Sequence, residues 1–413
     1  MIDKNLFLYD LAIVAIFKDE ARYLKEWLDY HLLAGVDHFY LYNNDSSDDY
    51  KEILAPYVEK ILVTLTELPG KMMQYPAYND AIDKYRFECR YIAFIDIDEF
   101  IFPKSNRPIV EAVDEILLNN PDAAGVGINW QLFGSNGQEK ADYSRGVLER
   151  FTRHALENAP FFDENGNRSG DAHVKTIANP RLIKFMYSPH TATYVDKKFA
   201  VNSNGEPMHT FYNDPALYDK IVVNHYCIKS REEFLLKKEK GRVAGTVDIN
   251  LVYFSTNDRN EVFDDGILKY RAARAKSFSF ESNEQRISRV INYLVKVVTS
   301  DELSLEAALT CRAVAEKFQI KIGDQSAEEI ALARIYQILN TDNILTYADL
   351  QLFTEVLPEI ISRPFPLAKK FPSVFSSRIL PAMLNKEKKS KAWSEYRNLR
   401  TLQRLLNSIE TRR

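Results

Sequence analysis

The segment from Tyr91 to Pro103 reads YIAFIDIDEFIFP, and it combines an apolar strand with a cluster of carboxylates. Its first half is an unbroken run of apolar, β-branched and aromatic residues, which is typical of a strand buried on both faces. Asp96 and Asp98 follow, and on an extended chain they would share one face about 7 Å apart. Two like charges so close repel, and hard oxygen ligands suit Mg²⁺ or Mn²⁺. The pattern therefore favours a metal and phosphate site over a solvated loop.

Further strands alternate with helices before this segment. Apolar strand patterns cover residues 11–17, 37–42 and 60–68, and helical patterns lie between them. This alternation predicts βαβ units and a mostly parallel sheet with helices on both faces. Ligands bind beyond the carboxyl ends of the strands in such sheets. Lys18, Asp45 and Asp96 each follow a strand, so we expect them to converge at one edge.

The chain is too long for one ordinary core, since it has 413 residues. From about Ser255 the pattern becomes helical, with an apolar stripe that includes Ile287, Val290 and Leu294. We therefore predict an α/β domain over residues 1–250 and an all-helical region over residues 251–413.

Charge and cysteine content bear on location. The net charge of −4 is unevenly distributed along the sequence. Residues from Arg363 onward include 13 basic and three acidic residues, which gives +10, and the residues before Arg363 carry −14. The three cysteines are far apart, which fits a reducing compartment. The apolar run Leu11–Phe17 is too short to span a membrane. The cysteines and the short apolar run predict a cytoplasmic protein.

A series of short polar and aromatic motifs runs along the first part of the chain. They are residues 17–20 (FKDE), 26–31 (EWLDYH), 35–40 (GVDHFY), 43–48 (NNDSSD), 78–81 (YNDA), 94–100 (FIDIDEF), Trp130 with 133–135 (FGS), 174–175 (VK) with Pro180, and 224–226 (NHY) with 229–230 (KS) and 233–234 (EF). Their order resembles that of nucleotide-sugar glycosyltransferases of the GT-A (Rossmann-like) fold, and more narrowly the family 2-like and family 92 group. The resemblance covers about residues 10–245. It departs from the usual pattern at Asp19, where many relatives carry asparagine, and at Gln138, where histidine is expected after the Phe-Gly-Ser segment.

This resemblance implies a donor site and a metal site. Asp96 and Asp98 would carry Mn²⁺ or Mg²⁺ together with His225, although a core histidine is the alternative for His225. The nucleotide and donor sugar would be bound by Phe17, Lys18, Asp45, Gln74, Asn79, Asp96 and Asp98. Lys229 is the cation after His225 that we expect to contact the diphosphate, because sugar transfer expels a concentrated negative charge.

The acceptor side is less sharply defined by sequence. An inverting enzyme needs a carboxylate to deprotonate the acceptor hydroxyl. Glu149 and Asp171 rank first among the candidates, which also include Asp142, Asp163 and Glu164. Trp130, Phe133 and Ser135 would bind the acceptor, with core packing and a turn as the alternative reading.

The predicted function is metal-dependent, inverting transfer of a hexose from a nucleotide sugar, expected to be a UDP-sugar, to a glycan or glycolipid hydroxyl. Its expected setting is bacterial surface polysaccharide synthesis, with no nucleic-acid partner. A non-catalytic GT-A-like binding protein is the main alternative. A nucleotidyltransferase ranks lower, because the turn Lys18-Asp19-Glu20 lacks glycine. The basic tail, with Leu399, Leu402, Leu405 and Leu406 beside arginines, predicts peripheral contact with an anionic membrane. The alternatives are docking on the acidic remainder of the chain and a dimer contact.

Overall fold

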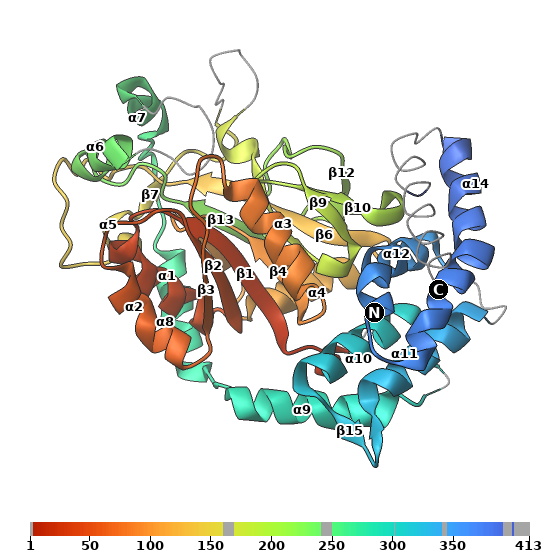
Figure 1. Cartoon of the computed structure of the whole chain (residues 1–413). Helices are drawn as coiled ribbons and strands as arrows, with labels where there is room; N and C mark the ends of the chain where they lie inside the picture. The colour runs from red at the N-terminus through yellow and green to blue at the C-terminus, as the bar shows by residue number, and fades with distance from the viewer. Residues whose placement is uncertain are drawn as a thin grey trace. The chain divides into compact units, whose positions relative to one another are not determined.

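The computed structural model describes residues 3–159, 169–240, 250–300, 302–340, 345–390 and residue 399 (Figure 1). It divides into two compact units. The larger unit is Tyr9–Asn283, and the smaller one combines the residues before Tyr9 with those from Glu284 onward. Asp163, Glu164 and the basic tail after residue 390, except residue 399, lie outside the described residues, so the predictions made for them stay predictions.

A ten-stranded sheet forms the centre of the larger unit. Four neighbouring strands run parallel in the order β3-β2-β1-β4, and β8 then pairs antiparallel with both β4 and β6. The strands of this run are β1 (Tyr9–Phe17), β2 (His38–Asn43), β3 (Val63–Glu67), β4 (Cys89–Phe94), β6 (Ala123–Leu132), β8 (Val174–Ala178), β11 (Phe199–Val201) and β12 (Pro207–Met208). The predicted mostly parallel α/β fold is confirmed.

Two further strands extend the sheet beside the carboxylate cluster. β13 (Ile221–His225) pairs antiparallel with β5 (Glu99–Pro103) and parallel with β6. In this register His225 lies opposite Glu99 and next to Leu132. The strand pairing therefore places the late histidine beside the carboxylates, although more than 120 residues separate them in sequence.

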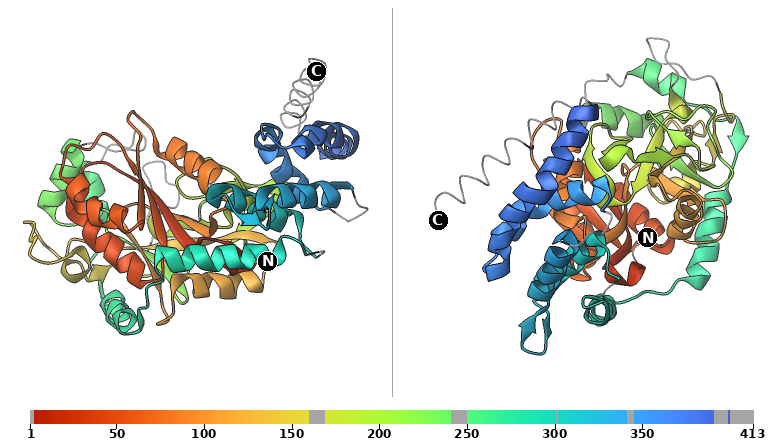
Figure 2. Two further views of the ribbon diagram at one scale, coloured as in Figure 1. Left: turned by 60° about the horizontal axis from the view of Figure 1, so that its bottom comes forward. Right: turned by 90° about the vertical axis from the view of Figure 1, so that its right-hand side faces the viewer.

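Helices cover both faces of the sheet (Figures 1 and 2). Leu11, Ile13, Ala15 and Phe17 of β1 share one core cluster with residues of α1, α2 and α4, whereas Tyr78 of α3 packs its ring 5.2 Å from that of Phe94. Side chains alternate along a strand, so α3 covers the opposite face. These helices are α1 (Ala21–Leu33), α2 (Tyr50–Glu59), α3 (Gln74–Tyr85) and α4 (Ile109–Leu118).

The larger unit extends past the predicted boundary at residue 250. Ile267 and Tyr270 of α8 are buried in the core of the sheet unit, which is why the helices after residue 250 group with it. The remaining elements of this unit include α5 (Val147–Arg150), α6 (Arg231–Lys240), α7 (Leu251–Asn257), α8 (Gly266–Ser277), β7 (Arg153–His154), β9 (Ile183–Met186), β10 (Ala192–Tyr194) and β14 (Val262–Phe263).

The smaller unit is helical, as the apolar stripes predict. Its elements include α9 (Asn283–Val297), α10 (Leu305–Phe318), α11 (Ala327–Asn340), α12 (Tyr347–Ile361), α13 (Phe371–Val374), α14 (Leu380–Ser390) and a hairpin of β15 (Lys321–Ile322) and β16 (Gln325–Ser326). Among the helices that the structure describes, none combines the length and hydrophobicity that a membrane span requires.

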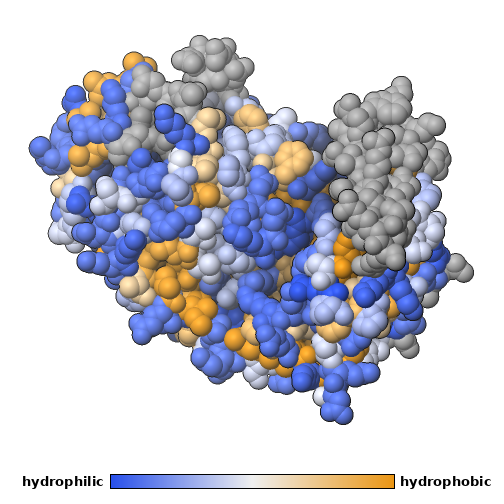
Figure 3. Space-filling view, in the orientation of Figure 1, coloured by the Kyte–Doolittle hydropathy of each residue, from blue (hydrophilic) through white to orange (hydrophobic). Residues whose placement is uncertain are grey.

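On the face drawn in Figure 3, hydrophilic residues predominate and apolar residues form separate small groups.

Helix α1 holds β5 through side chains that bond to the backbone of the strand. Trp27 Nε1–H donates to Glu99 O at 2.8 Å, and Tyr30 O–H donates to Ile101 O at 2.8 Å. Ile101 N–H donates to His31 Nε2 at 3.3 Å, so His31 carries its proton on Nδ1 and donates it to Trp27 O at 2.9 Å. The segment EWLDYH thus fixes the strand that begins at the carboxylate cluster.

We expect His31 to make the larger unit sensitive to acid. Burial lowers the pKa of His31 to about 3, so the unfolded chain binds a proton near pH 6.5 that the folded chain does not. The stability due to neutral His31 is therefore complete above pH 6.5 and is lost as the pH falls toward 3, by about 1.4 kcal/mol per unit.

The measurement is urea unfolding followed by fluorescence, because Trp27 and Trp130 both belong to this unit. In His31→Gln, the free energy of unfolding should depend less steeply on pH between 6 and 4, by about one proton. Equal slopes in the parent and the variant would contradict the prediction.

Candidate functional site

The acidic segment after β4 forms a tight turn. Strand β4 ends at Phe94, and Glu99 N–H donates to Asp96 O at 3.1 Å just before β5 begins. Asp96 N–H in turn donates to Glu99 Oε2 at 3.0 Å. The sequence-based geometry, with Asp96 and Asp98 on one face of an extended chain, is therefore wrong. It fails because the strand stops two residues before Asp96 and the backbone reverses.

Asp96 is held by a buried lysine. Its carboxylate accepts a hydrogen bond from Lys175 Nζ of β8 at 2.8 Å and another from Gln74 Nε2 of α3 at 2.8 Å. Lys175 Nζ also lies 3.3 Å from Glu99 Oε2, and the side chains of Lys175 and Glu99 are 1% and 0% exposed. Burial alone lowers the pKa of Lys175, but the carboxylates of Asp96 and Glu99 raise it above its usual value. Lys175 is therefore a fixed positive charge beneath the turn.

Glu99 is the most buried carboxylate of the turn. Its Oε1 has no hydrogen-bond partner. Burial raises the pKa of Glu99 to about 8, Lys175 opposes the shift, and the neighbouring charge of Asp96 adds to it. Glu99 thus accepts a proton more readily than an exposed glutamate, and Asp96 forms the shorter contact with Lys175, at 2.8 Å.

Asp98 points to a second group of partners. Its Oδ2 accepts a hydrogen bond from Lys237 Nζ of α6 at 2.6 Å, and its Oδ1 lies 3.6 Å from His225 Nε2. Burial alone raises the pKa of Asp98, but Lys237 and His225 hold it well below its usual value. His225, the last residue of β13, has its pKa lowered by burial, which favours the neutral imidazole.

The predicted ligands for a divalent cation are only partly brought together. Among the described residues, no three His, Cys, Asp or Glu side chains are grouped closely enough to hold a metal ion. Asp98 and His225 do present an anionic oxygen and a neutral ring nitrogen side by side, whereas Asp96 is bonded to Lys175. Mg²⁺ takes oxygen ligands, commonly one or two carboxylates completed by substrate phosphates and water, and Asp98 is the carboxylate that suits this role. The donor set therefore fits a cation at Asp98 and His225.

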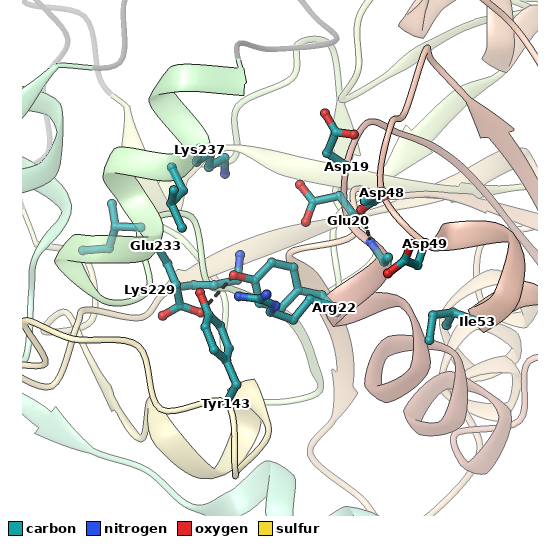
Figure 4. Close-up of a pocket in the computed structure, with 14 residues that line it drawn as sticks. Asp19, Glu20, Arg22, Asp48, Asp49, Ile53, Tyr143, Lys229, Glu233 and Lys237 are labelled. Atoms are coloured by element: carbon teal, nitrogen blue, oxygen red, sulfur yellow. Dashed lines mark hydrogen bonds between the residues drawn. The ribbon is translucent and has the colours of Figure 1, made fainter.

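A pocket of about 460 Å³ adjoins this group at the carboxyl end of β1. Figure 4 shows Asp19 and Glu20 on one side of it, and Lys229 and Lys237 on the other. The residues that line it are Asp19, Glu20, Ala21, Arg22, Tyr23, Asp48, Asp49, Ile53, Tyr143, Ile228, Lys229, Glu233, Leu236 and Lys237. Its size falls within the usual range for small-molecule sites.

Lys229 is placed by a buried ion pair. Glu233 accepts two hydrogen bonds from Arg150, at 2.8 Å each, one from Tyr23 O–H at 2.9 Å and one from Ser230 N–H at 3.1 Å. Lys229 adopts φ of 57° and lies with Nζ 4.4 Å from the ring centroid of Tyr23. Its pKa is lowered by burial, and Asp98 opposes the shift. The pair therefore fixes a cation on the pocket wall.

Several predicted donor residues have structural roles. Phe17 is 1% exposed and belongs to the core, and Asn79 is hydrogen-bonded to both Met186 N–H and Met186 O. Asp45 is exposed at the end of β2, where its carboxylate accepts from Gly70 N–H at 3.0 Å. Lys18 directly follows β1. The described residues that line the pocket include Lys229 from the predicted set, together with Lys237, Tyr23 and Glu233, which the sequence reasoning did not assign.

The residues predicted for the acceptor side separate in the structure. Phe133 is fully buried in the core, and Ser135 Oγ closes a turn by accepting from Gly137 N–H at 3.0 Å. Both follow the alternative reading of core packing and a turn. Trp130 is partly exposed, and its ring centroid lies 4.9 Å from that of His173 and 4.3 Å from that of His225.

The two leading candidates for the catalytic base also differ. Glu149 of α5 is exposed and accepts from Arg271 of α8 at 2.8 Å. Asp171 is 2% exposed, accepts a hydrogen bond from Tyr218 O–H, and lies two residues before His173. Of the two candidates, Asp171 is therefore the one near the aromatic cluster that includes Trp130 and His173.

Comparison with known proteins gives family 92 glycosyltransferases and galactan galactosyltransferases among the relatives. A family 92 glycosyltransferase of Ricinus communis is 25% identical over 145 residues, which cover 35% of this chain and 26% of that protein. One of Oryza sativa subsp. japonica is 26% identical, covering 35% and 24%. Galactan β-1,4-galactosyltransferase GALS1 of Arabidopsis thaliana is 23% identical over 251 residues, covering 53% and 49%. The matches thus span about a quarter to a half of these relatives' own lengths.

The solved structures that resemble the chain include Staphylococcus aureus TarS, residues 1–349. It is 12% identical and covers 96% of this chain and 91% of that chain, at a TM-score of 0.29 that is too low to establish a common fold. The model of glycosyltransferase family 92 matches residues 13–250, more than half of the 413 residues. The chain therefore belongs to glycosyltransferase family 92.

Proposed function

We propose that this protein transfers a hexose from a UDP-sugar to a hydroxyl of a glycan acceptor, with Mn²⁺ or Mg²⁺ as cofactor. The observation that carries the proposal is the group formed by Asp98, His225, Lys237 and Lys229 beside a pocket of about 460 Å³. One carboxylate, one neutral imidazole and two ammonium groups are suited to binding a cation and a diphosphate together.

The proposed role of these four residues is to bind and stabilise the leaving diphosphate. Lys229 and Lys237 line the pocket and supply positive charge in a partly enclosed site, where charge interactions are stronger than in water. Asp98 and His225 would hold the cation, which adds charge stabilisation to the departing phosphate oxygens when it is bound. Lys175 keeps Asp96 in place and so holds the turn that presents Asp98.

The acceptor is proposed to bind on the Trp130 side. Trp130, His173 and Tyr212 form consecutive ring contacts, at 4.9 Å and 4.6 Å between centroids, and such faces suit the apolar side of a sugar ring. Asp171 is the candidate base there, because it lies next to this cluster and Tyr218 orients its carboxylate. The name of the Arabidopsis relative, a galactan galactosyltransferase, supports a hexose donor and a glycan acceptor.

The experiment is a donor screen by nucleotide-sugar hydrolysis, with Mn²⁺, with Mg²⁺ and with EDTA. We expect one UDP-hexose to be hydrolysed in the presence of the cation, and EDTA to lower the rate to background. Calorimetry with UDP and Mn²⁺ is the companion measurement. If no UDP-sugar is hydrolysed and UDP does not bind, the proposal is wrong and a non-catalytic role gains support.

A further inference from the structure

The ammonium group of Lys237 occupies one side of the carboxylate that is suited to hold a cation. Lys237 Nζ donates to Asp98 Oδ2 at 2.6 Å and to Cys227 O at 3.0 Å. The other oxygen, Oδ1, lies 3.6 Å from His225 Nε2. A cation bound between Asp98 and His225 would therefore lie within a few ångströms of the ammonium group, where like charges repel.

The two lysines that bind the carboxylates of the turn, Lys175 and Lys237, differ in their freedom to move. The Lys175 side chain is 1% exposed and lies between Asp96 and Glu99. The Lys237 side chain is 25% exposed, lines the pocket and reaches Asp98 from α6. Figure 4 shows it on the same wall as Lys229. A lysine is a point charge on a flexible stem, so Lys237 can turn from Asp98 toward the pocket without disturbing the core.

We propose that Lys237 is an exchangeable counter-ion. In the ligand-free protein it neutralises Asp98, and when a divalent cation binds at Asp98 its ammonium group moves into the pocket and pairs with the diphosphate. The same positive charge thus keeps the empty site neutral and then contacts the donor. The second half of this inference rests on the proposed function, whereas the first half concerns only Asp98 and the cation.

The test is Mn²⁺ binding to the ligand-free protein, measured from the free Mn²⁺ signal by electron paramagnetic resonance. Lys237→Met removes the charge and keeps a flexible, unbranched side chain that is one atom shorter. We expect it to bind Mn²⁺ roughly tenfold more tightly than the parent, because the competing charge is gone. The matched control is Lys238→Met, the same change at the next, exposed residue of α6, which should bind Mn²⁺ like the parent. Equal affinities of the two variants, or weaker binding by Lys237→Met, would overturn the inference.

Two more measurements separate the counter-ion from other roles. Lys237→Arg keeps the charge and should not tighten Mn²⁺ binding. The second measurement is NMR of the parent protein with ¹³C-methylated lysines, in which the Lys237 signal is identified as the one that is missing from Lys237→Arg. This signal should shift on addition of Mg²⁺. An unmoved signal counts against exchange, even if Lys237→Met fails to fold.

The diphosphate is tested with UDP in the presence of saturating Mn²⁺. Lys237→Met should bind UDP roughly tenfold more weakly than Lys238→Met. Unchanged UDP affinity overturns the second half of the inference. If the parent does not bind UDP at all while the Mn²⁺ result holds, the proposed function fails and the counter-ion role stands.

Discussion

Replacing Asp98 by asparagine is expected to lower the rate of sugar transfer by roughly a hundredfold to a thousandfold, the usual loss when a charged group that stabilises a transition state is removed. Asparagine keeps the shape of the side chain but carries no negative charge. The variant therefore loses an anionic ligand for the cation and the ion pair with Lys237 at once. The fold should be retained, because side chains of α1 and the backbone of β13 hold the neighbouring strand β5 through hydrogen bonds.

The measurement is the initial rate of transfer or donor hydrolysis at saturating Mn²⁺, with circular dichroism as the check on folding. Asp122→Asn is the matched control, since Asp122 pairs with Lys198 and its side chain is 85% exposed. It should have the parent rate. A rate for Asp98→Asn within a factor of a few of that control, in a folded protein, would remove Asp98 from the site.

The second large effect concerns stability. Glu233→Ala should lower the free energy of unfolding of the larger unit by about 3–5 kcal/mol, because it leaves the Arg150 guanidinium buried without a counter-charge. The side chains of Glu233 and Arg150 are 2% and 1% exposed, so in the parent the pair is shielded from bulk water. The variant also loses the hydrogen bonds that Glu233 accepts from Tyr23 and Ser230.

The control is the double variant Arg150→Met, Glu233→Leu, which removes both charges and should recover a large part of the loss. Urea unfolding followed by tryptophan fluorescence measures all three proteins. A loss below about 1 kcal/mol for Glu233→Ala, the usual value of an exposed pair, would mean that the ion pair does not stabilise the larger unit as expected. The Lys229 side chain should lose its fixed position in Glu233→Ala, so UDP binding should weaken as well.

The arrangement of β1 to β4 was predictable because it follows from local sequence patterns. Apolar runs of strand length alternate with helical stripes, and these periodicities survive folding because each element buries its own apolar side chains. The convergence of the first and second strand ends was predictable for the same reason. In the structure, Asp19 Oδ1 accepts from Ser47 N–H at 2.6 Å, which joins the segments after β1 and β2.

The partners of the carboxylates were not predictable in this way. Lys175 reaches Asp96 from a strand 79 residues later in the chain, and Lys237 reaches Asp98 from a helix 139 residues later. Each lysine stands in a sequence context that also fits a solvated surface. Only the pairing of β8 with β4, and the position of α6 beside the turn, bring their charges to the carboxylates.

Local sequence was thus sufficient for the element types, the parallel sheet and the edge at which polar residues gather, since these follow from side-chain periodicity and strand direction. The tertiary structure decided which charges meet at that edge. In the folded chain the backbone turns at Asp96 and Phe133 is buried. Asn79 is hydrogen-bonded to Met186, and Lys237 is hydrogen-bonded to Asp98. The physical reason is that electrostatic pairing depends on distances of a few ångströms between residues far apart in the chain, and no local pattern specifies those distances.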